Sequence, residues 1–187
     1  MTPCFFMHKN SQKRIYLENA IYFVTTKTKD NYPYFRNEIL IRLFMNRLSI
    51  AEQSMRFRLF GFVVIPDHVH MLIQPRGKYN ISKIMFTIKK QFSHEANRLI
   101  GVNTRIPTTV GEQALVRLRR FVITHKIYIR KFNWHKSFHD HIIRDDEDFN
   151  RHIEYLRLNP IKHGLVKEGE FYPYLYIDEK LIHEIFE

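Results

Sequence analysis

The alternation of apolar and polar positions predicts strands and helices that follow one another along the chain. Residues 21–28, 57–65 and 68–74 are rich in β-branched and aromatic side chains, and we expect each to be a strand. Pro66 and Asp67 form a turn signal between the second and third of these segments. We therefore expect those two strands to pair in an antiparallel hairpin.

Helical periodicity marks the other segments. Apolar residues recur at helical spacing over 38–54 and from Asn80, a predicted N-cap, to about residue 100. A strand over 138–144 and a helix from 145 follow, and we expect that helix to end at Asn159 because Pro160 comes next. Residues 179–186 predict a last helix, whereas 101–133 give no clear pattern.

The order of these elements is β-α-β-β-α, an insert, then β-α. This order predicts an α+β fold, a ferredoxin-like four-stranded antiparallel sheet with helices on one face and a further C-terminal helix. We expect a single domain over 1–187, with a core over about 15–166, a basic insert over about 101–133 and a tail over 167–187.

Composition narrows the class of protein. The chain has 187 residues with 44% hydrophobic and 26% charged, which is typical of a globular domain. No apolar run approaches the roughly 18 residues that a membrane span requires, and no signal peptide is evident. The single cysteine, Cys4, excludes a disulfide scaffold and a cysteine-based zinc finger. We therefore expect a cytoplasmic protein.

Charge adds a candidate partner. The net charge is +11 and the isoelectric point about 9.8. Residues 76–136 hold fourteen basic and two acidic side chains, whereas 137–187 hold six basic and twelve acidic ones. A basic region of this kind is typical of nucleic-acid binding. A solvated basic face, or attraction to phosphorylated ligands or acidic proteins, is the alternative.

The sharpest chemical feature is His68-Val69-His70. Residues two apart on a strand point to the same face, with Cα atoms roughly 6–7 Å apart, so two imidazoles can converge on one divalent cation. Val69 and Met71 then point to the opposite face and pack on helices. The alternative is two ordinary polar residues on a half-exposed strand, because a bare His-x-His is a common pattern.

A second pair with the same spacing, His139-Asp140-His141, serves as a comparison. The geometric argument applies to it equally, so the spacing alone leaves it open as a metal site. We interpret it as mainly structural or DNA-contacting.

The third feature is the helix end HIEYLRLNP. Tyr155 and Asn159 lie four residues apart and therefore on one helix face, at the edge of the predicted buried stripe. There they can reach a neighbouring site. An interfacial aromatic side chain and a polar helix end are the alternatives.

Together these segments resemble a known family. PDHVHMLI, WHKSFHDHIIR and YLRLNPIKHGLV occur in the order and spacing of the REP-associated tyrosine transposases, which are single-tyrosine HUH (IS200-like) transposases. HVH followed about 85 residues later by Tyr-x-x-x-Asn-Pro-Ile-Lys is the specific part of the pattern. The likeness covers roughly residues 15–166 apart from 101–130, and the tail FYPYLYIDEK departs from the family pattern.

The resemblance implies roles for particular residues. His68 and His70 match the metal-binding histidines, Asn159 the residue that completes the metal site, and Tyr155 the nucleophile on the C-terminal helix. His139 usually corresponds to an aromatic residue, which makes the second His-x-His look accidental. The implied cofactor is Mg or Mn.

The implied function is a metal-dependent single-stranded DNA endonuclease and strand transferase that forms a 5′-phosphotyrosine at or near DNA hairpins. It would act as a monomer or homodimer, without a membrane and associated with the nucleoid when bound to DNA. A non-catalytic nucleic-acid-binding module and a phosphodiesterase that uses water are the alternatives.

Contacts to the DNA backbone are expected in the basic region. The expected nucleic-acid-binding residues are Arg117, Arg119, Arg120, Lys89, Lys90 and Trp134. Tyr32, Tyr34 and Phe132 are further aromatic residues that could stack unpaired bases. Packing in the core is the more frequent role of such side chains.

Overall fold

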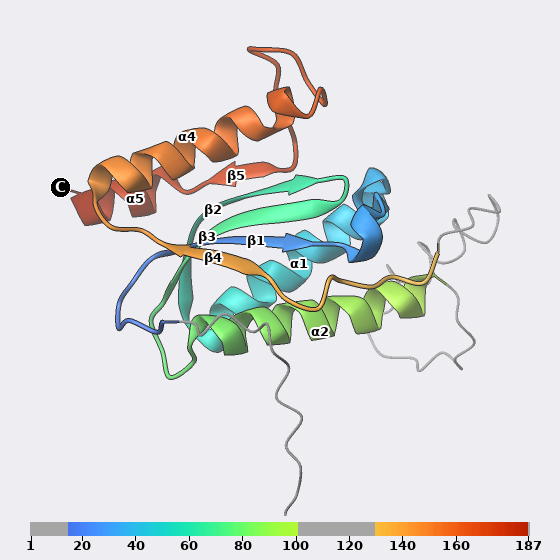
Figure 1. The fold of residues 1–187 in the computed structure, drawn as a ribbon, viewed down its shortest axis with the longest axis horizontal. Helices are drawn as coiled ribbons and strands as arrows, with labels where there is room; N and C mark the ends of the chain where they lie inside the picture. Colours follow the sequence, from blue (N-terminus) through green and yellow to red (C-terminus); the bar gives the residue numbers. More distant parts are fainter. Residues whose placement is uncertain (1–14, 101–129, 187) are drawn as a thin grey trace, which may run out of the picture.

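The computed structural model describes residues 15–100 and 130–186. They form a five-stranded sheet between two layers of helices (Figure 1). The strand order is β4-β1-β3-β2-β5, and every pair is antiparallel. The strands are β1 (Tyr22–Lys27), β2 (Phe57–Ile65), β3 (His68–Pro75), β4 (His139–Ile142) and β5 (Leu175–Ile177).

The helices are α1 (Glu38–Met55), α2 (Ile81–Leu99), α4 (Asp146–Lys162) and α5 (Glu179–Phe186), with short 3-10 turns η1 (Lys29–Asn31) and η2 (Tyr34–Arg36). Asn80 caps α2 as predicted, since its Oδ1 accepts a hydrogen bond from the Lys83 amide at 3.0 Å. Within the described residues, no helix is long and apolar enough to cross a membrane.

Alternating side chains on β3 separate two cores. Val69, Met71 and Ile73 join the larger core under α1 and α2. Leu72 joins a smaller core on the opposite face, where α4 contributes Phe149. The predicted division of β3 into a helix-packing side and a histidine side is confirmed, but α4 and α5 cover the histidine side as well.

The α+β class with an antiparallel sheet is confirmed, and the sheet has one strand more than the four predicted. β5 has only three residues, which is too short for a periodic pattern to reveal. It pairs with β2 beside Gly61, where a Cβ would lie 2.9 Å from the Tyr176 carbonyl oxygen and 3.1 Å from Leu156 Cδ1. The missing side chain therefore lets β5 and α4 approach β2 closely.

The predicted end at Asn159 of the helix that begins near residue 145 is wrong. α4 continues through Pro160 to Lys162. Proline lacks only the amide that would bond the Leu156 carbonyl, so in the last turn it removes one bond. The following amides still pair, His163 with the Asn159 carbonyl at 3.1 Å and Leu165 with that of Pro160 at 2.9 Å.

Candidate active site

The two histidines of β3 lie deep in the face covered by α4. His68 is 7% exposed and His70 is 4% exposed, and their ring centroids are 4.7 Å apart. His68 Nδ1 bonds Asp67 Oδ1 at 2.7 Å, and His70 Nδ1 bonds Thr25 Oγ1 at 2.8 Å. With Nδ1 of each ring engaged in this way, Nε2 is the nitrogen left for another ligand.

Burial keeps both imidazoles neutral. Desolvation, reinforced by the neighbouring His68 and His163, lowers the pKa of His70 to about 3. Burial also lowers the pKa of His68, although its bond to Asp67 opposes that shift. A neutral imidazole keeps the lone pair that a metal ion requires.

α4 and its C-cap residue present three polar side chains to these histidines at intervals of four residues. Tyr155 lies edge-on to His70, with ring centroids 5.1 Å apart. Two turns later His163 lies 5.1 Å from His68. Asn159 stands between them on the same helix face and is 1% exposed. The fold therefore brings the predicted Tyr155 and Asn159 to the predicted histidine pair within one chain.

Two polar atoms at this place are buried without a hydrogen-bond partner. They are His70 Nε2 and Asn159 Oδ1. Leaving a buried polar atom unpaired costs about 1–3 kcal/mol, so such atoms mark a missing partner. A nitrogen and an amide oxygen are both suitable ligands for a divalent cation, but mixed donors of this kind do not select one metal. The residues present thus fit a divalent cation held by His68, His70 and Asn159.

The hydroxyl-bearing ring of Tyr155 is accessible and lies next to positive charge. Tyr155 is 37% exposed. The Lys162 ammonium nitrogen lies 4.8 Å from the centroid of its ring, and Phe23 packs against the ring edge at 5.6 Å between centroids. Phe23 also stacks on His70 at 5.4 Å, so one buried ring supports both candidate groups.

The predicted nucleic-acid-binding residues lie elsewhere. Lys89 and Lys90 are on α2, on the opposite side of the sheet, and the Lys89 ammonium donates to the His135 and Ser137 carbonyl oxygens at 2.8 and 3.0 Å. Trp134 packs against the larger core, with Phe132 5.0 Å from it between ring centroids. Arg117, Arg119 and Arg120 lie outside the described residues.

The aromatic residues considered for base stacking are mostly core residues. Tyr34 and Phe132 are 3% and 0% exposed, so neither presents a ring face to solvent. Tyr32 is partly buried and packs on Tyr34 at 4.5 Å.

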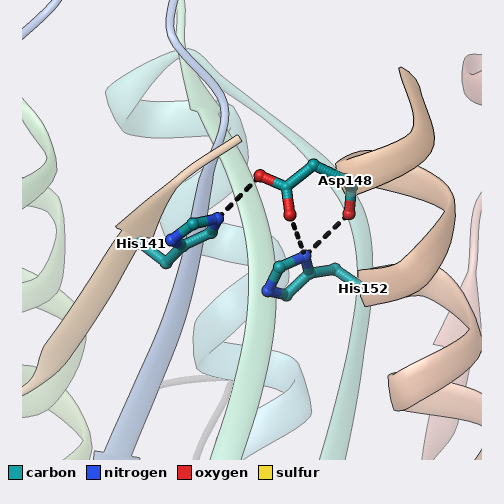
Figure 2. Close-up of side chains that lie close together, drawn as sticks. All are labelled: His141, Asp148 and His152. Atoms are coloured by element: carbon teal, nitrogen blue, oxygen red, sulfur yellow. Dashed lines mark hydrogen bonds and ion pairs between the residues drawn. The ribbon is translucent and has the colours of Figure 1, made fainter. Parts of the chain in front are cut away.

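A second polar cluster joins β4 to α4 (Figure 2). It consists of His141, Asp148 and His152, whose ligand-type atoms lie within 4.8 Å of one another. His141 Nε2 bonds Asp148 Oδ2 at 2.7 Å, and His152 Nδ1 donates to the Asp148 carbonyl oxygen at 2.7 Å. The second His-x-His therefore contributes one histidine to this cluster, while His139 is exposed.

The electrostatics of this cluster favour a structural role, in which it holds α4 against β4, over a role as a cation site. Burial alone would raise the pKa of Asp148, but hydrogen bonds from His141, the Arg144 backbone and side chain, and Arg151 hold it well below its usual range. The carboxylate is thus an anion already neutralised by two guanidinium groups. A metal ion there would have to displace these cations.

Sequence reasoning missed His163, Asp148 and His152. His163 follows Asn159 by one further helical turn. This spacing would have indicated His163 if the helix had not been predicted to end at Asn159. His152 and Asp148 are one turn apart. Nothing in the local sequence indicates that Asp148, one of several acidic residues in the first turn, is the buried one.

Comparison with known proteins supports the motif analysis. Residues 16–103 match the family model described as "Transposase IS200 like". The chain is 23% identical over 166 residues to a REP-associated tyrosine transposase of Escherichia coli, covering 87% of this chain and 79% of that protein. A Haemophilus influenzae protein named for the same family is 24% identical over 166 residues, covering 88% of this chain and 84% of that protein.

The fold has a counterpart among solved structures. A REP-associated tyrosine transposase bound to a REP hairpin superposes with a TM-score of 0.67 at 18% identity, covering 95% of this chain and 88% of that one. Family model, relatives and shared fold together confirm the resemblance that the motifs indicated: over most of its length, this chain is similar to the REP-associated tyrosine transposases.

Proposed function

We propose that this chain is a metal-dependent single-stranded DNA endonuclease and strand transferase that acts at or near DNA hairpins. The observation that carries the proposal is the position of Tyr155, 5.1 Å between ring centroids from His70 of its own chain and one helical turn from the buried Asn159. The names of the relatives, and the hairpin bound in the structural counterpart, support the same substrate class.

The proposed reaction is a transesterification. The Tyr155 hydroxyl oxygen attacks the scissile phosphorus and the bond from phosphorus to the 3′ oxygen breaks. The phenolic proton is released to solvent, and the leaving 3′ oxygen takes up a proton from solvent. The products are a 5′-phosphotyrosine and a free 3′-hydroxyl. Because the phosphodiester is exchanged and not hydrolysed, a second 3′-hydroxyl can reverse the step and join a new strand without ATP.

Residues of the chain prepare this step. Asp67 and Thr25 hold the rings of His68 and His70 so that these, with Asn159, would bind Mg or Mn. When bound, a divalent cation polarises the scissile phosphate and offsets its developing charge. Lys162, beside the Tyr155 ring, adds a fixed positive charge where the anionic backbone must approach.

Detection of a covalent adduct tests this proposal. We expect end-labelled hairpin oligonucleotides with single-stranded arms, incubated with the full chain and Mn or Mg, to give a slow-migrating species on a denaturing gel. That species should carry only the fragment downstream of the cut. Tyr155→Phe and His68→Ala should both abolish it, and EDTA should do the same.

Matched controls separate chemistry from folding. Tyr176→Phe changes a tyrosine of similar exposure, 43%, and should leave the adduct intact. His139→Ala changes the exposed histidine of the second His-x-His and should also have no effect. Cleavage that survives Tyr155→Phe would identify a phosphodiesterase that uses water. Tight binding with neither cleavage nor adduct would identify a binding module.

A further inference from the structure

The outer face of α2 carries an exposed aromatic side chain in the middle of the helix. Phe86 is 57% exposed, whereas its neighbours Ile84 and Met85 are fully buried. The hydrophobic stripe of α2 is therefore complete without Phe86, and the larger core does not explain its presence. An exposed aromatic ring on a helix that packs well without it indicates a surface used for binding.

Positive charge gathers around this ring. The Lys83 and Lys90 ammonium nitrogens lie 5.5 and 5.7 Å from its centroid. α2 contains four basic residues and one acidic residue, Glu95, which is paired with Arg47 on α1. Two hydrated ammonium groups over an exposed ring are held weakly, so they can move to a phosphate when an anion approaches.

A groove runs between this helix face and the chain segment that leads to β4. It has a volume of about 390 Å³, within the range of small-ligand sites, and Ser82, Phe86, Lys90 and Lys136 are among its lining residues. Lys89 donates two hydrogen bonds to carbonyl oxygens of that segment, and these bonds hold the segment against α2. In Figure 1 the segment lies alongside α2 on the side of the sheet away from α4.

We propose that this groove binds an unpaired nucleotide of the DNA strand. The base stacks on Phe86, and the flanking phosphates contact Lys83, Lys90 and Lys136. The proposal rests on the proposed function only for the class of substrate. It adds a second contact on the opposite face of the sheet from Tyr155, so a strand that occupies both must pass an edge of the sheet.

An exposed aromatic ring beside several lysines favours an unpaired nucleotide as the ligand of this groove. Aromatic rings flanked by cations are the usual platform for single-stranded nucleic acid, because every base has a stacking face and every nucleotide a phosphate. Double-stranded DNA offers phosphates but no free base face. The groove should therefore distinguish unpaired from paired DNA.

The test measures binding in a Tyr155→Phe background, so that cleavage does not interfere. Fluorescence anisotropy compares a hairpin with a single-stranded arm to the same hairpin without it. We expect Phe86→Leu to weaken binding of the armed hairpin roughly 5- to 100-fold and to leave the blunt hairpin almost unchanged. Phe86→Trp should retain the affinity. Phe171→Leu, at an exposed phenylalanine in the tail, is the matched control.

Two further readouts locate the contact. Lys83→Gln combined with Lys90→Gln should reduce the slope of log affinity against log salt by about 1.4, since each phosphate contact on a single strand contributes about 0.7. An arm carrying 5-iodouracil should give a photocrosslink to Phe86 that a peptide map identifies.

The proposal would be overturned if Phe86→Leu bound the armed hairpin as tightly as the parent does. A loss of thermal stability without a change in affinity would overturn it too, because Phe86 would then be packing against another part of the chain. Neither outcome depends on a covalent adduct. Failure of the groove is therefore distinguishable from failure of the Tyr155 chemistry.

Discussion

At the scale of single residues, the site depends on which atoms are left without partners. Asp67 and Thr25 occupy one nitrogen of each imidazole, and burial keeps both rings neutral. His70 Nε2 and Asn159 Oδ1 are then the buried atoms that need a ligand. A divalent cation bound between them would supply the partner that both atoms lack.

The depressed pKa of His70 predicts how metal affinity responds to pH. An exposed imidazole protonates near pH 6.5 and would lose metal below that pH. His70, with a pKa of about 3, stays neutral, so Mn²⁺ affinity measured by electron paramagnetic resonance should be nearly constant between pH 8 and 6. His70→Ala should remove this binding. A tenfold loss of affinity centred near pH 6.5 would contradict the assignment.

At the scale of elements, one buried carboxylate fastens α4 to β4. Asp148 is 2% exposed and accepts hydrogen bonds from His141 on β4 and from the backbone of Arg144 in the connecting turn. His152, one turn further along α4, packs on Phe23 at 4.5 Å between ring centroids. The position of α4, and with it that of Tyr155, thus depends on a contact outside the β3 histidine pair.

Replacing that carboxylate should loosen the helix. We expect Asp148→Asn to lower the free energy of unfolding by about 2–4 kcal/mol, because two guanidinium groups lose their buried anion. The depressed pKa means that this stability is present above about pH 4 and is lost as the pH falls below it. Denaturant unfolding at pH 7 and pH 3 measures both.

The difference in stability between the variant and the parent should therefore be smaller at pH 3 than at pH 7. A difference between them that is as large at pH 3 as at pH 7 would show that the charge of Asp148 contributes nothing. Glu147→Gln, at an exposed neighbour on the same turn, is the control and should change stability by less than about 0.5 kcal/mol.

At the scale of the whole molecule, charge is divided along the chain. The region 76–136 carries fourteen basic and two acidic residues, and the part after it is net acidic. The described portion of the basic region includes α2, which lies on the side of the sheet away from α4, the helix that contains Tyr155 (Figure 1). The positive charge of α2 and the proposed chemistry are thus placed on different faces of the sheet.

The positive charge of residues 76–136 predicts that DNA affinity depends strongly on salt concentration. Each phosphate contact releases counterions, so affinity for a single strand should fall about 10- to 100-fold between 50 and 200 mM salt. Anisotropy titrations with one oligonucleotide at several salt concentrations measure the slope. Lys180→Gln, on the acidic C-terminal part, should leave the slope unchanged, whereas an affinity independent of salt would show that the positive charge does not bind DNA.

The sequence by itself determined the local features of this protein. Strand and helix periodicity set the bounds of β2 and α5, Asn80 marked the start of α2, and the spacing of His68 and His70 placed both on one face. These features follow from backbone geometry over a few residues. The motifs that surround Tyr155 were sufficient to indicate the resemblance to a transposase family as well.

Only the tertiary structure decided which side chains of distant strands and helices come into contact. Strand order brings His141 opposite Phe23, and the packing of α4 places His163 beside His68 and buries Asp148 while its acidic neighbours stay exposed. On the opposite face, the packing of α1 and α2 places Trp134 against the larger core and leaves Phe86 exposed. Such contacts join residues far apart in the chain. The periodicity of one segment does not indicate which other element will cover its apolar face.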